Sequence, residues 1–427
     1  MKSIRIITLG CSKNSVDSEH LLSMLPETSY TLKREEGADI LLINTCGFIG
    51  DAKQESIQTI LEAVEAKKEG LYGRIAVFGC LSQRYSKELP LEIPEVDAWF
   101  GARDLEPVAD WIGIGRENKA PRRLEREGLP YAYLKISEGC DRRCSYCAIP
   151  FIRGAHKSVS IEALVAEAKY LASKGVKELL LIAQDTTYYG LDLYGRRALS
   201  DLLRALSQIE GIEWIRIHYS YPDSFPEDVL DVMAENPKIC PYMDIPLQHI
   251  SDKVLNMMHR HTSCESIKAL IRKFREKVPG LVLRTTMIVG HPGEGEAEFE
   301  ELLDFVKEFK FERLGAFQYS EEDGTYAANN YEDSVSQSIK QSRYDAIMSL
   351  QSEISLRFNQ SRVGSIERVL VDDCVDGTLV CRSRYESPDV DGEILVKCSG
   401  DASKYISKFI DVKILAADEY DLIAEIV

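Results

Sequence analysis

The sequence predicts an α/β protein in three parts: an N-terminal doubly wound parallel sheet, a central partial (β/α)6 barrel and a small C-terminal antiparallel β-barrel. Three observations predict this order. Short, continuous apolar runs alternate with helical patterns up to about residue 115. The same alternation restarts at Tyr131 and continues through six strand patterns. Beyond Arg362, short β-rich runs are separated by turn signals such as Asp376-Gly377, which is typical of a small barrel.

The N-terminal sheet, residues 1–115, is predicted from apolar runs that end at cysteines. Helical patterns at Asp17–Met24 and Asp51–Lys68 lie between these runs. The carboxyl ends of parallel strands meet at one edge of a sheet, where ligands bind, so we expect the three cysteines to meet in a metal site. The alternative is three buried structural cysteines. The runs and their cysteines are Ile4–Gly10 with Cys11, Ile40–Thr45 with Cys46, and Ile75–Gly79 with Cys80.

Residues 116–130 are predicted to form a linker, because they are highly charged, contain Pro121 and lack apolar periodicity. The central domain follows at 131–335. Six βα units are too few for a closed eight-stranded barrel, so we expect an open one. One of its helices is predicted to begin with a capping box at Ser224–Glu227. Its predicted strands are Tyr131–Ser137, Glu178–Gln184, Trp214–Tyr219, Tyr242–Leu247, Val282–Val289 and Leu314–Tyr319.

A connecting helix is predicted at 336–360, and residues 361–427 form the predicted C-terminal barrel. This last segment has eight Lys and Arg against fourteen Asp and Glu, a net charge of −6. A barrel that recognises RNA is expected to be basic, because phosphate contacts dominate such affinity. The acidic barrel therefore indicates a basic protein as partner, unless its charge serves only solubility. Its predicted strands are Glu367–Asp372, Gly377–Arg382, Glu393–Cys398 and Phe409–Ala416.

Composition indicates a cytoplasmic protein. The chain has 427 residues, is 44% hydrophobic and 28% charged, and carries a formal net charge of −17. No apolar run approaches the roughly 20 residues of a membrane span, and Met1–Arg5 leads into a strand and not into a signal peptide. Eleven cysteines without an export signal indicate a reducing compartment and metal chemistry. The acidic charge also disfavours nucleic-acid binding.

Three cysteines form a tight motif directly after the first central strand. Cys140, Cys144 and Cys147 have the spacing C-x3-C-x2-C. Three thiolates can hold a 4Fe–4S cluster and leave its fourth iron open to a substrate, because a closed cluster takes four. The alternative is a zinc site with His156 as the fourth ligand. This alternative is disfavoured, because zinc sites prefer paired C-x2-C motifs.

The remaining cysteines show no comparable spacing, so we expect them to be packing residues. A third metal site formed by the last three of them is the alternative. They are Cys240, Cys264, Cys374, Cys381 and Cys398.

With Tyr146 before its last cysteine, the motif closely resembles that of the radical S-adenosylmethionine (SAM) enzymes. The order of the three domains resembles the methylthiotransferases, in which the terminal barrel is called TRAM and serves substrate recognition. This resemblance covers essentially the whole chain. Three segments resemble the branch that modifies a small-subunit ribosomal protein (RimO-type), although Val159 stands where that pattern has an arginine. The segments are Cys147–Gly154, Asp244–Ser251 and Tyr385–Glu393.

The resemblance implies two 4Fe–4S clusters and SAM as cofactors. It implies a deoxyadenosyl radical, and a methylthio group added to the β-carbon of an aspartate in the twelfth small-subunit protein. An electron donor is required. No catalytic side chain beyond the cluster ligands is predicted. The implied ligands are Cys140, Cys144 and Cys147 for the SAM-binding cluster, and Cys11, Cys46 and Cys80 for an auxiliary cluster.

Further residues are candidate SAM contacts. Tyr146 is one by the family pattern, and the others close predicted barrel strands, where active sites gather. For each polar residue a structural hydrogen bond is an equally open interpretation. Glu294, Glu296 and Glu298 are interpreted as favourable charges at a helix N-terminus. The candidates are Tyr146, Gln184, Asp185, Gln248, His249 and Gly290.

Two other functions remain open at this point. A transfer-RNA methylthiotransferase would show salt-sensitive RNA binding. A non-catalytic iron–sulfur scaffold would bind clusters without cleaving SAM. If recognition and radical chemistry lie on separate domains, deleting residues 361–427 weakens binding of a basic protein and spares SAM cleavage.

Overall fold

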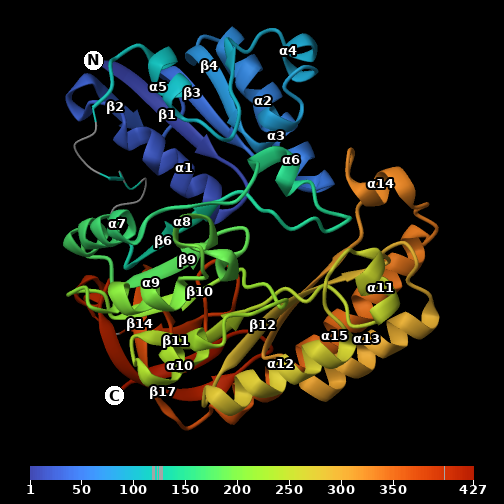
Figure 1. The fold of residues 1–427 in the computed structure, drawn as a ribbon. Coiled ribbons are helices and arrows are strands. Elements are labelled where there is room, and N and C mark those ends of the chain that lie inside the picture. The colour runs from blue at the N-terminus through green and yellow to red at the C-terminus, as the bar shows by residue number, and fades with distance from the viewer. Residues whose placement is uncertain (118–120, 123, 125–127, 399) are drawn as a thin grey trace.

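The computed structural model describes residues 1–117, 121–122, 124, 128–398 and 400–427. The N-terminal sheet lies at the top in Figure 1, the central open barrel lies below it, and the C-terminal barrel packs under the central one. Part of the predicted linker, residues 118–120, 123 and 125–127, lies outside the described residues. No helix among the described residues has the length and apolar character of a membrane span.

The N-terminal sheet is parallel throughout, in the order β2-β1-β3-β4-β5. Helices cover both faces, which confirms the doubly wound prediction. On one face α1 (Ser12–Ser23) and α5 (Glu106–Ile112) pack on the strands, and on the other face α2 (Gly50–Lys68), α3 (Cys80–Arg84) and α4 (Leu89–Glu92) do so. The strands are β1 (Lys2–Thr8), β2 (Tyr30–Lys33), β3 (Ala38–Thr45), β4 (Tyr72–Gly79) and β5 (Ala98–Trp99).

The central sheet has six parallel strands in the order β13-β12-β11-β10-β9-β6 and stays open, which confirms the partial barrel. Alternate residues of each strand face opposite sides. Leu179 and Leu181 of β9 therefore pack on the surrounding helices, and Glu178 faces the interior. The strands are β6 (Tyr131–Lys135), β9 (Glu178–Ile182), β10 (Trp214–Ile217), β11 (Ile239–Asp244), β12 (Val282–Val289) and β13 (Arg313–Gln318).

Helices line the outside of this sheet, and the long α15 (Gln337–Ser361) runs along β13. The capping box predicted at Ser224–Glu227 is wrong. Helix α10 begins later, at Asp228, and the Ser224 hydroxyl donates to the Asp223 carboxylate at 3.0 Å. The other central helices are α6 (Ile149–Arg153), α7 (Ile161–Ser173), α8 (Leu191–Tyr194), α9 (Leu199–Ser207), α11 (Asp252–Met257), α12 (Cys264–Lys277), α13 (Glu296–Phe309) and α14 (Tyr326–Asn330). A small hairpin pairs β7 (Ser137–Glu138) with β8 (Lys157–Ser158).

The C-terminal strands close into the barrel β14-β15-β16-β18-β17, which confirms the predicted architecture. Four of its pairings are antiparallel, and β16 with β18 is parallel. Strand β18 was not predicted, although the barrel closes only through it. Cys381 lies in the barrel core, and Cys374 and Cys398 pack against it. The strands are β14 (Ile366–Val375), β15 (Thr378–Arg382), β16 (Ile394–Lys397), β17 (Phe409–Ala417) and β18 (Leu422–Ile426).

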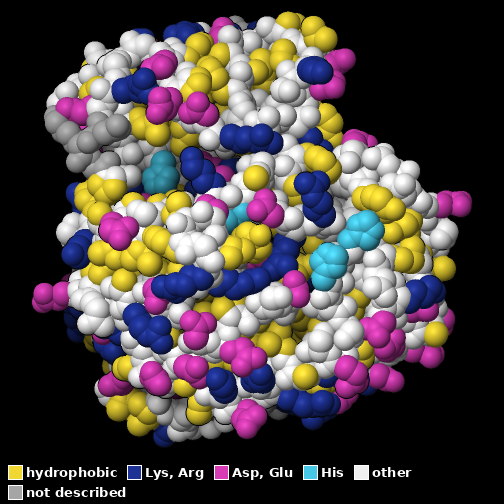
Figure 2. All heavy atoms as spheres, in the orientation of Figure 1, with side chains coloured by type: hydrophobic (Ala, Val, Ile, Leu, Met, Phe, Trp, Pro, Cys, Tyr) yellow, Lys and Arg dark blue, Asp and Glu magenta, His cyan; other side chains and the backbone are white. Residues whose placement is uncertain are grey.

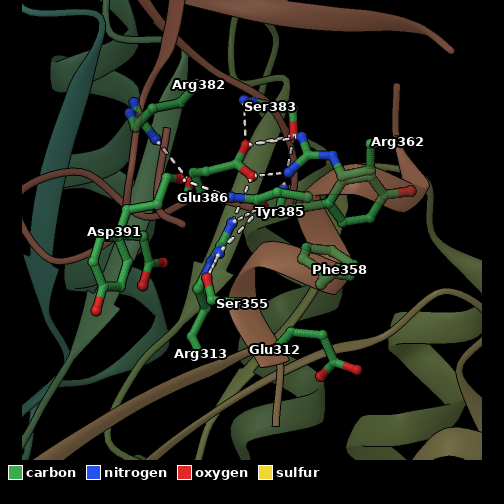
Figure 3. A network of polar contacts seen from close by, with 12 residues as sticks. Glu312, Arg313, Ser355, Phe358, Arg362, Arg382, Ser383, Tyr385, Glu386 and Asp391 are labelled. Atoms are coloured by element: carbon green, nitrogen blue, oxygen red, sulfur yellow. Dashed lines mark hydrogen bonds and ion pairs between the residues drawn. The ribbon is translucent and has the colours of Figure 1, made fainter. Parts of the chain in front are cut away.

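Buried ion pairs join this barrel to the amino ends of the central strands. Glu386 accepts from Arg362 and, at 3.1 Å, from Arg313 at the start of β13 (Figure 3). Glu178 at the start of β9 accepts from Arg216 at 2.8 Å and from Arg382 at 2.7 Å. These groups are almost fully buried, and the pairs Arg313–Glu386 and Arg382–Glu178 cross the domain boundary, so separation of the domains would leave buried charges short of a partner.

The loop after β15 enters the amino end of the central barrel. Ser387 lies 2.9 Å from the ring of His218, and the Tyr242 hydroxyl donates to Asp391 at 2.7 Å. Both partners come from central strands or their ends. The C-terminal barrel therefore completes the interior of the central domain.

Candidate functional site

One cavity of about 450 Å³ lies where the N-terminal sheet meets the carboxyl ends of the central strands. All six predicted cluster ligands line this cavity. In the N-terminal domain, Cys46 and Cys80 directly follow β3 and β4, and Cys11 stands shortly after the end of β1. The other three cysteines stand on the loop after β7. Parallel strands carry both sets of residues to facing edges.

Local backbone geometry makes room for the N-terminal triad. Gly10 has φ +87°, and a Cβ there would lie 2.8 Å from the Cys46 sulfur. The Asn14 amide donates to the carbonyl of Leu9 at 2.7 Å and to that of Thr45 at 3.1 Å. This amide therefore fixes the ends of β1 and β3 relative to each other, which holds their cysteines in register.

The second triad is held by backbone bonds within its loop. The amide of Cys140 donates to the carbonyl of Gly154 at 3.0 Å, and that of Cys147 to the carbonyl of Cys144 at 3.1 Å. Gly139 has φ +78°, and a Cβ there would overlap the carbonyl oxygen of Ala155. Only glycine fits both the conformation and the space.

The donor set fits iron–sulfur clusters. The residues that line the cavity include six thiols and no carboxylate, and thiolates are the usual cluster ligands. Burial raises the pKa of Cys140 to about 12 and that of Cys80 to about 11, where the Arg153 guanidinium opposes the rise. Binding a cationic group would therefore release protons from these thiols.

A single metal ion fits less well. Among the described residues, no three side chains of His, Cys, Asp or Glu gather closely enough to hold one ion. A cubane cluster attaches its thiolates to separate irons, so its ligands stand farther apart. The zinc alternative also loses its fourth ligand, because His156 is not among the residues that line the cavity with Cys140, Cys144 and Cys147.

Three of the candidate SAM contacts line the cavity: Tyr146, Gln184 and Gln248. Asp185 lies behind it, where its carboxylate pairs with Arg142 at 3.0 Å. Asp185 also accepts from the Thr187 amide at 2.9 Å. Its contact with the cavity is therefore indirect, through Arg142, which does line it.

His249 and Gly290 are not among the lining residues of this cavity. His249 accepts from the amide of Ser251 at 3.0 Å, and its Nε2 lies 3.3 Å from Glu294. The amide of Gly290 also donates to Glu294, at 3.0 Å. Glu294 is buried and pairs with Arg343 at 2.7 Å, so its interpretation as a charge at a helix N-terminus is wrong. Glu298 does cap α13, since it accepts from the Gly295 amide at 2.8 Å.

Four basic side chains that line the cavity were not predicted. Lys13 lies 3.4 Å from the centre of the Tyr219 ring. Arg260 donates to the Tyr146 hydroxyl at 3.2 Å. Arg142 and Arg153 lie within motifs quoted from the sequence, but their spacing gave no reason to single them out, because the four residues come from separate elements. They are Lys13, Arg142, Arg153 and Arg260.

A second cavity, of about 830 Å³, opens beside the first along β12 and β13. The two cavities share Tyr146, Gln248 and Phe317 among their lining residues. Phe317 is 53% exposed, so the shared boundary reaches the surface. This second cavity gives a route from solvent toward the cysteines.

Comparison with known proteins defines the class of the chain. Residues 134–306 match the Radical SAM superfamily, residues 3–101 match an uncharacterised protein family, UPF0004, and residues 363–427 match the TRAM domain. The chain is similar in fold to the radical SAM methyltransferase TsrM from Kitasatospora setae, which was solved with cobalamin and a [4Fe-4S] cluster bound. The TM-score is 0.56, and the two proteins are 13% identical over 76% of this chain and 73% of that chain. The cobalamin-dependent radical SAM enzyme OxsB gives a TM-score of 0.52 at 13% identity over 80% and 56% of the two chains. Fold and cysteine motif thus define a radical SAM enzyme, a class that uses a 4Fe–4S cluster and SAM.

Curated relatives narrow this class. The ribosomal protein uS12 methylthiotransferase RimO of Bacteroides fragilis is 49% identical over 100% of this chain and 99% of its own length. The proteins of the same name from Phocaeicola vulgatus and Flavobacterium psychrophilum are 50% and 51% identical, over 99% of this chain and 99% and 97% of their own lengths. The chain belongs to this RimO family of radical SAM methylthiotransferases.

Proposed function

We propose that this protein adds a methylthio group to the β-carbon of an aspartate of ribosomal protein uS12. The observation that carries the proposal is the single cavity lined by two cysteine triads. Radical chemistry and sulfur transfer at one carbon require both centres to reach the same substrate. A cavity shared by both triads meets that requirement.

In this proposal Cys140, Cys144 and Cys147 hold the SAM-binding cluster, and the other triad, Cys11, Cys46 and Cys80, holds an auxiliary one. When bound, the two clusters and SAM supply one-electron cleavage of SAM and an iron site that carries sulfur. An electron donor must deliver the electron. The chain itself supplies the thiolates, the enclosure and the orientation.

The other residues of the cavity wall orient SAM and exclude water. The ring of Tyr146, oriented by Arg260, offers an apolar face to the adenine. Gln184 and Gln248 offer amide groups to polar atoms of SAM. Asp185 acts through Arg142. His249 and Gly290 both contact Glu294 and have a structural role outside the cavity wall.

Charge supports a protein substrate over RNA. Ribosomal proteins that contact RNA are strongly basic, and this chain carries a net charge of −17. Figure 2 shows a stripe of Lys and Arg side chains below the N-terminal domain, with both signs of charge mixed over the rest of that face. Complementary charge mostly accelerates encounter and selects partners.

We propose that the chain divides into domains at 1–115, 131–335 and 361–427. We also propose that catalysis needs no binding of nucleic acid and that the reaction takes place in the cytoplasm.

Anaerobic incubation with SAM and a reductant tests the proposal. Purified uS12 and transfer RNA are offered separately, and the mass of each is measured. A methylthio mass increase on one aspartate of uS12 is expected. Modification of the transfer RNA alone would overturn the proposal in favour of the RNA-modifying branch. Cluster binding without deoxyadenosine formation would indicate a scaffold.

A further inference from the structure

Arg153 is a buried cation that connects the two cysteine triads. It ends α6, the short helix that follows Cys147. Its side chain is 4% exposed and crosses from the central domain to the N-terminal sheet. There its Nε–H donates to the sulfur of Cys80 at 3.2 Å. A residue attached to one triad thus contacts a ligand of the other.

The guanidinium is held in place by its other nitrogens. Nη2 donates to the Asn14 side-chain oxygen at 2.6 Å. Nη1 donates to Asp17 at 2.6 Å and to Glu138 at 3.2 Å. Because these bonds fix both Nη atoms, the Nε–H is directed to the Cys80 sulfur. Only a planar fork with five donors can make all these bonds at once.

The contact matters because the surroundings of a cluster set its reduction potential. Hydrogen bonds to the sulfurs, net charge and solvent exposure all shift that potential. Arg153 supplies a hydrogen bond and a permanent positive charge at a sulfur that is nearly fully buried. Both effects favour the reduced, more negative state of a centre held by Cys80.

We propose that Arg153 is a positioning residue of the auxiliary centre: it orients the Cys80 sulfur and raises the reduction potential of the cluster bound there. The same contact connects the two triads, because Arg153 lies on α6, the helix after the SAM-cluster loop. This inference rests on the auxiliary cluster of the proposed function.

When Arg153 is substituted, its neighbours Asp17 and Glu138 still have a cationic partner in Lys135. Lys135 also pairs with Asp17, and it pairs with Glu138 at 2.8 Å. The folded state is therefore expected to survive in Arg153→Gln, which removes the charge, and in Arg153→Lys, which keeps the charge but loses the fork.

The test is a redox titration of the full-length holoprotein followed by electron paramagnetic resonance. In Arg153→Gln the potential of the auxiliary cluster is expected to shift to more negative values, with the iron content and the SAM-cluster potential unchanged. In Arg153→Lys the shift is expected to be smaller. The same titration with Cys140, Cys144 and Cys147 replaced by alanine isolates the auxiliary signal.

Arg103→Gln is the matched control. Arg103 crosses the same domain boundary, where it donates to the carbonyls of Ile152 at 2.9 Å and Phe151 at 2.7 Å and touches no sulfur. No shift is expected. A purely structural role for Arg153 predicts equal behaviour of the two variants, so an equal shift, or an unchanged potential in folded Arg153→Gln, would overturn the proposal.

Two further measurements keep the outcome decisive. If Arg153→Gln does not fold, Arg153→Lys is judged by the same criterion. In wild-type protein carrying ¹⁵N-arginine, the auxiliary cluster spin is expected to show a nitrogen coupling, and its absence overturns the proposal. A chain that binds no cluster at Cys11, Cys46 and Cys80 would instead overturn the proposed function itself, a result that iron analysis distinguishes from an unshifted potential.

Discussion

Cys46 and Cys144 line the same cavity but follow strands of different sheets, so changing each one separates two chemistries. With Cys46→Ala, SAM cleavage is expected to continue, because it needs only the other triad, and methylthio transfer is expected to be lost. With Cys144→Ala, both are expected to be lost. Chromatography of deoxyadenosine and mass spectrometry of uS12 measure the two steps. Deoxyadenosine formed by the Cys144→Ala variant would contradict the ligand assignment.

Gly139 shows how strongly one residue constrains the cysteine loop. Gly139→Ala places a Cβ against the Ala155 carbonyl at a positive φ, and we expect a loss of roughly 2 kcal/mol of stability. We also expect weaker iron binding by the second triad. Gly175→Ala is the control, because Gly175 has φ +95° but nothing within 4 Å of the added Cβ. Thermal unfolding compares the two variants, and equal losses would mean that the steric contact contributes nothing.

At the scale of elements, the Glu386 network joins β13, α15 and the loop after β15 (Figure 3). Burial alone would raise the pKa of Glu386, but Arg362 and Arg313 lower it from the ordinary 4.5 to about 2. Because the folded-state pKa is lowered, the network stabilises the fold fully above pH 4.5. That stabilisation is lost as pH falls from there toward 2.

Glu386→Gln therefore tests the docking of the C-terminal barrel. The substitution leaves the buried Arg313 and Arg362 short of a counter-charge. We therefore expect the free energy of unfolding to fall by roughly 3 kcal/mol at neutral pH. The loss is expected to shrink below pH 4.5, where Glu386 itself becomes protonated on unfolding. Glu353→Gln, at an exposed pair with Arg357, is expected to change little. Denaturant unfolding at several pH values measures both, and a pH-independent difference would argue against the network.

For the whole molecule, the expectation that the C-terminal barrel can be removed without harm to SAM cleavage is not supported. Deleting residues 361–427 would remove Arg382 as a partner of Glu178 and the Arg384 carbonyl as an acceptor for Arg216. It would also remove Ser387, the hydrogen-bond partner of the His218 ring. We expect the truncated chain to aggregate or unfold and to lose SAM cleavage together with substrate binding. Size-exclusion chromatography, thermal unfolding and a deoxyadenosine assay check this. A monodisperse truncated protein that still cleaves SAM would restore the picture of an independent module.

The sequence alone was enough to predict both parallel sheets, four of the five strands of the C-terminal barrel and the meeting of Cys11, Cys46 and Cys80. The reason is that apolar runs and cysteine spacing are local signals. Parallel topology then carries strand ends to one edge without further information. Strand β18 was missed because Leu422–Ile426 is short, and its place in the barrel depends on pairing with the distant β16 and β17.

Only the tertiary structure decided the contacts between domains. Arg153 reaches Cys80, and Ser387 reaches His218, across long stretches of chain. Glu294, interpreted from the sequence as a helix charge, is a buried partner of Arg343. No periodicity encodes such pairs, because each depends on how finished elements pack. The sequence therefore determined which elements form and where the cysteines stand, and packing decided which charges surround them and how the C-terminal barrel closes the central one.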